Sequence, residues 1–241
     1  MNGNRFTLDS LPWMLGRPLG KAFQGDKELM QELVVLDDRF HTSEGLLTFK
    51  LPVSVELVAG LQRVRRLHGL KQLICYNRPV KTEWFLSLLE PALPTLEELS
   101  FRECRLNDDC LDWLSEQPPS SPLKKVDLGH NGFSSESLIR FVSSDFLSGV
   151  EELVLEGNKV NTDVCKALVR NPKTTSLKHL SIHNQYVRNT SLLELSKAPY
   201  FQLNRVDVGS LKLSEATIRQ LSNTSLAKVY SFGHERSIVR L

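Results

Sequence analysis

Residues 123–133 read LKKVDLGHNGF, and residues 150–160 read VEELVLEGNKV. In both stretches apolar residues occupy the first, fourth and sixth positions, asparagine the ninth, and another apolar residue the eleventh. The second stretch begins 27 residues after the first (150 − 123). Self-similarity at a fixed period of this length indicates a repeat protein, so the two stretches predict further copies on either side.

Further copies of this pattern occur both before and after the two stretches. Its apolar triplets are Leu70/Leu73/Cys75, Leu96/Leu99/Phe101, Leu123/Val126/Leu128, Val150/Leu153/Leu155, Leu177/Leu180/Ile182, Leu203/Val206/Val208 and a weaker Leu226/Val229/Ser231. The triplets start at 70, 96, 123, 150, 177, 203 and 226, in steps of 26, 27, 27, 27, 26 and 23 residues. A chance run of leucines would not keep phase over that length.

Each repeat predicts a short strand followed by a helix. Residues three and five places after the start lie two apart, so in a strand both point into the core. The second halves carry apolar residues at helical spacing behind Ser, Thr, Asp or Asn, which favour helix starts. The clearest examples are residues 108–114, 135–142 and 162–169.

The ninth position holds asparagine in two repeats, Asn131 and Asn158, whereas the first repeat has Arg78 there and others have Cys104, Gln185 or Leu211. The pattern resembles the leucine-rich-repeat family, as a divergent member of its ribonuclease-inhibitor-like or cysteine-containing subclass. The resemblance implies an α/β leucine-rich-repeat solenoid (horseshoe), with parallel strands on the concave face and helices on the convex face. In that family the asparagines form a ladder, which we expect to be broken here.

Three regions are expected along the chain. Residues 1–45 do not fit the repeat and are interpreted as an N-terminal capping region. Residues 46–232 form the solenoid of about seven to eight repeats, opening with a degenerate repeat at Leu46/Phe49/Leu51. Residues 233–241 form a C-terminal tail. Leu11-Pro12 resembles the opening of an F-box, so an alternative is that residues 1–45 dock an adaptor protein.

Composition bounds the partners and the compartment. The net charge is only +2, so charge alone does not indicate a nucleic-acid partner. No apolar run approaches the length that spans a bilayer. No secretory signal is recognisable, and the four cysteines form neither a CxxC pair nor a zinc-like cluster with histidine. We therefore expect reduced, buried thiols in a cytoplasmic or nuclear monomer that binds a protein rather than nucleic acid or membrane.

The repeat phase also predicts which side chains the concave surface offers. Residues two, four and six places after each start must point away from the core. From these rows we predict a partner-binding set of Tyr76, Glu98, Arg102, Lys125, Asp127, Glu152, Glu156, His179, His183, Arg205, Asp207, Tyr230 and Phe232. For Tyr230 and Phe232 the alternative is packing against the tail or a cap.

Charge alternates from strand to strand beside these rows. The doublets are Glu97-Glu98, Lys124-Lys125, Glu151-Glu152 and Lys178-His179. Opposite charges on neighbouring strands attract, so one interpretation is surface electrostatics that fix the register, each exposed pair contributing under about 1 kcal/mol. The other interpretation is a docking stripe of mixed charge, and the two are compatible.

Catalysis is not predicted, and neither is a cofactor or a metal. Asp127 and His183 share a face but lie two strands apart, about 9–10 Å, which is beyond hydrogen-bond reach. Glu156 and His183 are lateral neighbours and could pair, but two ligands do not make a zinc site. We predict a non-catalytic protein–protein interaction scaffold. The alternatives are the substrate-recognition subunit of a ubiquitin ligase and a GTPase-activating-type regulator.

Overall fold

The computed structural model describes residues 70–119, 122–184, 186–200, 203–222 and 224, together with the backbone of two short strands at 46–49 and 229–230. The predicted capping region 1–45 and tail 233–241 lie outside the described residues. Within the described residues, no helix is long and apolar enough to cross a membrane.

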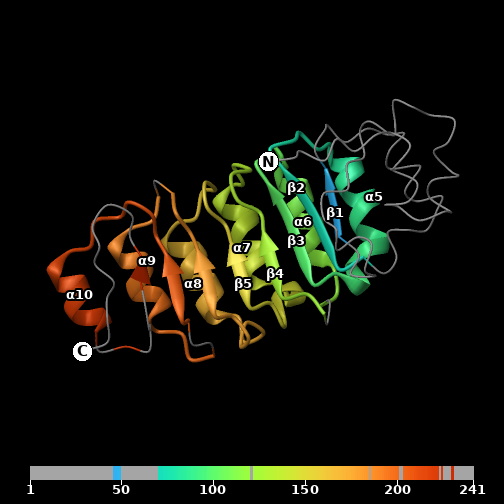
Figure 1. The fold of residues 1–241 in the computed structure, drawn as a ribbon. Helices are drawn as coiled ribbons and strands as arrows, with labels where there is room; N and C mark the ends of the chain where they lie inside the picture. The colour runs from blue at the N-terminus through green and yellow to red at the C-terminus, as the bar shows by residue number, and fades with distance from the viewer. Residues whose placement is uncertain are drawn as a thin grey trace, which may run out of the picture.

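One parallel sheet runs through the described chain in sequence order (Figure 1). Its strands are β1 (Leu46–Phe49), β2 (Gln72–Tyr76), β3 (Glu98–Arg102), β4 (Lys125–Asp127), β5 (Glu152–Val154), β6 (His179–Ser181), β7 (Arg205–Asp207) and β8 (Val229–Tyr230). Each strand pairs with the next strand along the chain. This order is what a solenoid requires, since each repeat contacts its sequence neighbours.

A helix follows each strand from β2 to β7 and lies in a second layer behind the sheet (Figure 1). The helices are α5 (Thr82–Ala92), α6 (Asp108–Glu116), α7 (Ser135–Ser143), α8 (Thr162–Arg170), α9 (Asn189–Leu195) and α10 (Glu215–Leu221), with short 3-10 turns η2 (Leu93–Thr95) and η3 (Asp145–Leu147). Asn107, Ser134, Asn161 and Ser214 cap helix starts by accepting hydrogen bonds from first-turn amides. The predicted alternation of strand and helix is therefore confirmed.

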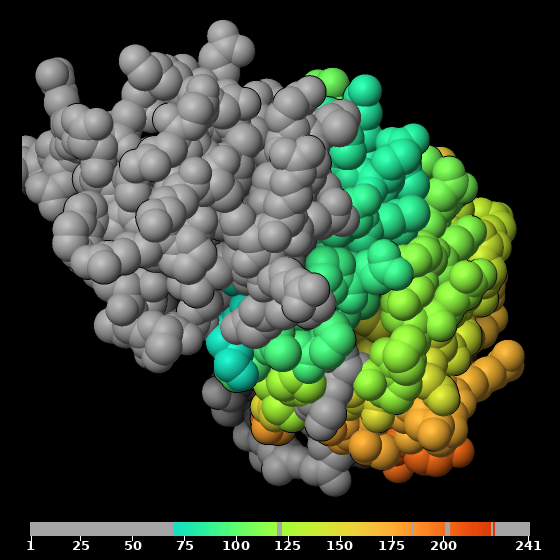
Figure 2. Space-filling model, turned by 90° about the vertical axis from the view of Figure 1, so that its right-hand side faces the viewer, coloured from blue at the N-terminus to red at the C-terminus, as the bar shows by residue number. Residues whose placement is uncertain are grey.

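The strand register reproduces the predicted repeat phase. One row of backbone partners runs through Gln72, Glu98, Lys125, Glu152, His179 and Arg205, all two places after a repeat start. In the last and weakest repeat, Val229 pairs with Val206, and both residues lie three places after a repeat start. Figure 2 shows the coloured repeats stacked against one another in sequence order.

The first strand departs from the prediction. Leu47 pairs with Leu73 and Phe49 with Cys75, so the expected alignment of Leu46, Phe49 and Leu51 with the later triplets is wrong. The spacing is 26 residues (73 − 47) rather than 24, in line with the other repeats. Leu46, Leu47 and Phe49 are all apolar, and the pattern alone did not show that Leu47, rather than Phe49, aligns with Leu73.

The core lies between the two layers. The side chains three and five places after each start are all buried from β2 to β7, including the expected Leu99, Leu128, Leu153 and Leu180. Side chains from the helices pack against them. For example, the Phe85 ring of α5 packs edge-on against the Phe101 ring of β3, with 5.1 Å between the ring centroids. This burial leaves the alternate residues of each strand on the opposite face of the sheet.

The asparagine ladder spans two repeats and continues with other side chains. The side-chain oxygen of Asn158 accepts hydrogen bonds from the backbone amides of Asn131, Gly132 and Phe133. Its side-chain NH₂ group donates to the backbone carbonyls of Leu128 and Leu155. Asn131 bonds the preceding turn in the same way. These bonds satisfy backbone groups that would otherwise be left unpaired where the chain turns away from the strand.

Beyond these two repeats, a thiol and a displaced amide extend the ladder. The Cys104 thiol donates to the carbonyls of Cys75 and Arg102. In the β6 repeat Asn184, one place before the expected Gln185, donates to Val160 and accepts from Val187. The ladder is therefore modified rather than simply broken.

Candidate functional site

The side chains that point away from the core form one surface, the strand face. It consists of the residues two, four and six places after each repeat start. The predicted set lies on it, partly or fully exposed: Tyr76, Glu98, Arg102, Lys125, Asp127, Glu152, Glu156, His179, His183, Arg205 and Asp207. Only the backbone of Tyr230 is described, and Phe232 lies outside the described residues, so their predicted role stays a prediction.

Three residues in the middle row of the strand face, four places after a repeat start, are nearly buried. Ser100, Val154 and Ser181 are only 9%, 9% and 6% exposed, although they face away from the core. They are shorter than the polar side chains two places before and after them along the chain, as Val154 is beside Glu152 and Glu156. The sequence predicted that these residues point away from the core, and in the structure they form the lowest part of the strand face.

One set of charges, the outer cluster, joins Glu98, Lys125 and Glu152 across three neighbouring strands. The Lys125 ammonium lies 3.3 Å from the Glu98 carboxylate and 3.7 Å from that of Glu152. Gln72 also donates to Glu98, at 3.0 Å. Partial burial disfavours the charged form of Lys125, but the two carboxylates outweigh it, so the pKa of Lys125 is raised.

A second set, the inner cluster, joins Arg102, Asp127, Glu156 and Ser181. The Arg102 guanidinium pairs with Glu156, two strands away, and lies 3.6 Å from Asp127. The Ser181 hydroxyl donates to the other Glu156 oxygen. The cluster therefore crosses four strands, from β3 to β6.

Gly129 makes the long reach of Arg102 possible. It occupies the position between Arg102 and Glu156 in the row six places after each start. A Cβ there would lie 2.8 Å from Nη1 of Arg102, closer than real Cβ atoms come. A side chain at Gly129 would therefore stand in the path of the ion pair.

The two inner carboxylates respond to the site in opposite ways. Burial raises the pKa of Asp127, and the hydrogen bond from Gly129 and the charge of Arg102 only partly offset it. Burial also acts to raise the pKa of Glu156, but the bonds from Ser181 and Arg102 outweigh it and the pKa is lowered. Glu156 is therefore the stably ionised member of the inner cluster.

A third set of ion pairs follows the predicted charge alternation at the edge of the strand face. Lys71 lies 2.9 Å from Glu97, and Glu151 lies 2.6 Å from Lys178 and 3.6 Å from Lys124. All five side chains are well exposed, so each pair contributes little to stability. These contacts support the interpretation that alternating charges help to hold the strand register.

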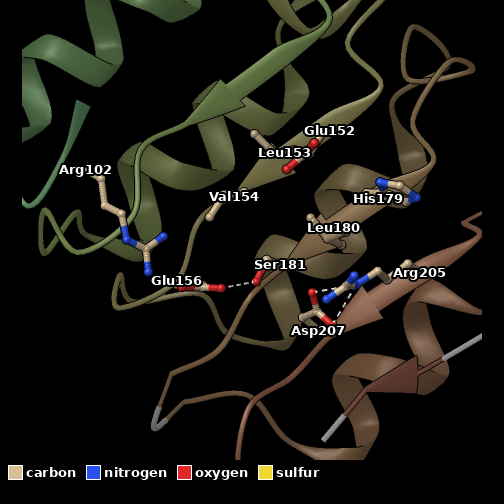
Figure 3. Close-up of a pocket in the computed structure, with 10 residues that line it drawn as sticks. All are labelled: Arg102, Glu152, Leu153, Val154, Glu156, His179, Leu180, Ser181, Arg205 and Asp207. Carbon is tan, nitrogen blue, oxygen red and sulfur yellow. Dashed lines mark hydrogen bonds and ion pairs between the residues drawn. The ribbon is translucent and has the colours of Figure 1, made fainter. Parts of the chain in front are cut away.

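A hollow of about 330 Å³ opens on the strand face over β5, β6 and β7 (Figure 3). Its lining combines the low apolar and small residues with charged side chains from both clusters: Arg102, Glu152, Leu153, Val154, Glu156, His179, Leu180, Ser181, Arg205 and Asp207. Arg205 and Asp207 pair with each other along β7 at 2.9 Å. Sequence reasoning did not find the hollow, although the small residues of the middle row are the signal that could have indicated it.

Ser181 and His183 each lie against a neighbouring group on this face. Ser181 donates to the Glu156 carboxylate, and His183 lies over Gly209, where a Cβ would be 1.9 Å from its ring. The considered pairing of Glu156 with His183 is not formed, because Glu156 turns to Arg102 instead. Among the described side chains, no group of three or more His, Cys, Asp or Glu could hold a metal ion.

Comparisons with known proteins address the fold. No family model matches the chain, and neither does any curated protein. Among solved structures, the chain is similar to leiomodin-1 actin-binding site 2, with 16% identity, a TM-score of 0.43, and coverage of 52% of this chain and 78% of that one. It is also similar to the yeast complex of Rad7 and Elc1, with 13% identity, a TM-score of 0.43, and coverage of 95% of this chain and 84% of that one.

Both likenesses are distant, so the repeat itself decides the fold. A parallel sheet in chain order, a 26-to-27-residue period and an Asn131–Asn158 ladder describe one architecture. The fold is a leucine-rich-repeat-like solenoid. Its strands form one face and its helices the other (Figure 1).

Proposed function

We propose that this chain is a non-catalytic interaction module that binds a protein partner through its strand face. The observation that carries the proposal is the hollow over β5–β7, framed by charged side chains that are already held by ion pairs. Side chains fixed before binding lose less conformational entropy when a partner docks. A continuous sheet also offers a partner more than one repeat to contact.

The chemistry of the strand face supports binding rather than catalysis. A nucleophilic serine needs a base that accepts its proton, and the Ser181 hydroxyl faces a carboxylate that Arg102 holds ionised. The lowered pKa of Glu156 also makes it a poor proton acceptor near neutral pH. The polar groups of this face are instead arranged to neutralise one another.

The cysteines support a finer assignment within the leucine-rich-repeat-like fold and a compartment. Cys104 takes the ladder position, which favours the cysteine-containing subclass, while the period of 26–27 residues also suits the ribonuclease-inhibitor-like subclass. All four cysteines are free and buried. Reduced thiols suit the cytoplasm or nucleus, where we propose that the protein acts as a monomeric scaffold. The ubiquitin-ligase and GTPase-activating alternatives gain no support from the described residues.

Affinity capture with two matched variants tests the proposal. The strand-face variant carries Arg205→Ala and Asp207→Ala, and the control carries Asp163→Ala and Lys166→Ala on α8, so each variant removes one ion pair and leaves the net charge unchanged. All four side chains are at least partly exposed, so both variants should fold, which thermal unfolding checks. We expect mass spectrometry to show partners lost from the strand-face variant and kept by the control. Equal partner sets from the strand-face variant and wild type would contradict the proposal.

A further inference from the structure

The strand face carries more negative than positive charge at its centre. The outer cluster places one lysine between two glutamates, and the inner cluster places one arginine between an aspartate and a glutamate. The Arg205–Asp207 pair beside them is balanced. The centre therefore has an excess of carboxylates although the whole chain has a net charge of +2. At close range the local excess governs, because salt screens more distant charges beyond about 8 Å.

Glu152 is the carboxylate of the hollow that is least committed to other groups. Its contact with Lys125 is 3.7 Å, whereas Lys125 lies closer to Glu98, at 3.3 Å. Its side chain is 39% exposed, against 19% for Glu156, which Arg102 and Ser181 already hold. Glu152 therefore retains the capacity to accept a further charged hydrogen bond.

The floor of the hollow suits the stem of a long basic side chain. Val154 lies in the middle row, two residues along β5 from Glu152, so both point to the strand face. Lysine and arginine stems lie along apolar surface while their charged ends reach a polar group. The two guanidinium groups of the lining, Arg102 and Arg205, are already paired with Glu156 and Asp207. A partner carboxylate placed there would therefore meet the excess carboxylate, Glu152, and be repelled.

We propose that the hollow receives a lysine or arginine side chain from a basic segment of the protein partner, with its stem over Val154 and its charged end at Glu152. The inference rests on the proposed function and adds the chemistry of the partner. It makes Glu152 the residue that selects for basic segments. The inner cluster then fixes one side of the hollow and contributes no direct bond to the partner's cation.

NMR titration of the isotope-labelled full chain tests this chemistry directly. The probes are short Gly/Ser peptides in which alternate residues are arginine, glutamine or glutamate. We expect the arginine peptide to shift amide resonances of β5, β6 and β7, and the other two to have little effect. Glu152→Gln should weaken binding of the arginine peptide about fivefold, the loss of one partly exposed ion pair. Glu136→Gln on α7 removes an exposed carboxylate from the helix layer and should leave the affinity unchanged.

Two results would overturn the inference. One is a glutamate or glutamine peptide that shifts the same resonances as strongly as the arginine peptide. The other is an unchanged affinity in Glu152→Gln. Either result leaves the capture experiment with Arg205→Ala and Asp207→Ala intact, so failure of this inference is distinguishable from failure of the proposed function.

Discussion

The outer and inner clusters share the same charge ratio but differ in burial. Each places two carboxylates around one cation, yet the outer glutamate that lines the hollow is twice as exposed as the inner one. The inner cluster adds a hydroxyl donor and a glycine that clears its path. Removing an ion-pair partner from the inner cluster takes a favourable contact from a partly buried charge that water reaches poorly. In the outer cluster the remaining charge is more exposed, so water can replace the lost partner.

This difference assigns the two clusters different roles. The inner cluster ties β3 to β6 and holds one side of the hollow in place. The outer cluster shares one lysine between two glutamates, so Glu152 can turn to a partner at little cost. A rigid cluster beside an adjustable one is an arrangement suited to recognition, because the first shapes the site and the second exchanges its contact.

The largest expected effect comes from Glu156→Ala. The substitution leaves the Arg102 guanidinium and the Ser181 hydroxyl without their shared acceptor, and it should lower the free energy of unfolding by about 2–3 kcal/mol. Urea unfolding measures this loss. Glu152→Ala is the matched control in the outer cluster. Equal losses in the two variants would remove the distinction between the clusters.

Gly129→Ala should act through Arg102 rather than through the backbone. The added Cβ displaces the guanidinium from its path to Glu156, and we expect an effect of about 1 kcal/mol that depends on the pair. In a Glu156→Ala background the pair with Glu156 is gone and Arg102 keeps only its 3.6 Å contact with Asp127, so the same substitution should cost much less. A double-mutant cycle of unfolding free energies measures the coupling. Additive effects would show that Gly129 serves another purpose.

The pH dependence of stability should have opposite signs at the two inner carboxylates. The pKa of Glu156 is lowered on folding, so its contribution is present above its unfolded pKa of about 4.3 and is lost as pH falls through the folded value. The stability advantage of wild type over Glu156→Gln should therefore shrink below about pH 5. Unfolding curves across this range measure it, and an advantage that does not change with pH would contradict the assignment.

Asp127 provides the internal comparison for that experiment. Burial raises its pKa on folding, so the folded protein takes up its proton first as the pH falls. Relative to Asp127→Asn, wild type should thus gain stability on acidification, through the interval between the raised folded value and an unfolded value of about 3.9. A loss over the same interval would mean that the hydrogen bond from Gly129 and the charge of Arg102 outweigh burial at Asp127.

The smallest expected effect belongs to the outer cluster. Glu152→Gln should change the unfolding free energy by less than about 0.5 kcal/mol, because Lys125 keeps Glu98 as its nearer partner. The small effect should fade further in high salt, which screens exposed charges. Thermal unfolding at low and high ionic strength measures both. A salt-independent loss of the size expected for Glu156→Ala would show that the outer cluster is structural too.

The sequence predicted those features that depend on neighbouring strands. The period placed Leu99, Leu128, Leu153 and Leu180 in the core, and the charge doublets indicated attraction between adjacent strands, as Lys71 and Glu97 show. Both follow from the alternation of side chains along a strand and from one fixed inter-strand distance. The same reasoning placed the outward rows correctly.

The features that sequence reasoning missed depend on the lengths of side chains and on positions without a side chain. Arg102 reaches Glu156 across a whole strand because the intervening residue is Gly129, and adjacent-strand reasoning paired Glu156 with His183 instead. The hollow exists because Val154 and Ser181 are short beside longer neighbours. These properties arise from combinations of residues in three or four repeats, so no single repeat shows them.

Hydrogen exchange of the full chain with and without a captured partner tests the central claim most directly. If the strand face binds the partner, amides of residues 152–156, 179–183 and 205–209 should exchange more slowly in the complex, while those of α7, α8 and α9 keep their rates. Slower exchange confined to the three helices, with the strand segments unchanged, would place the partner on the opposite layer and contradict the account.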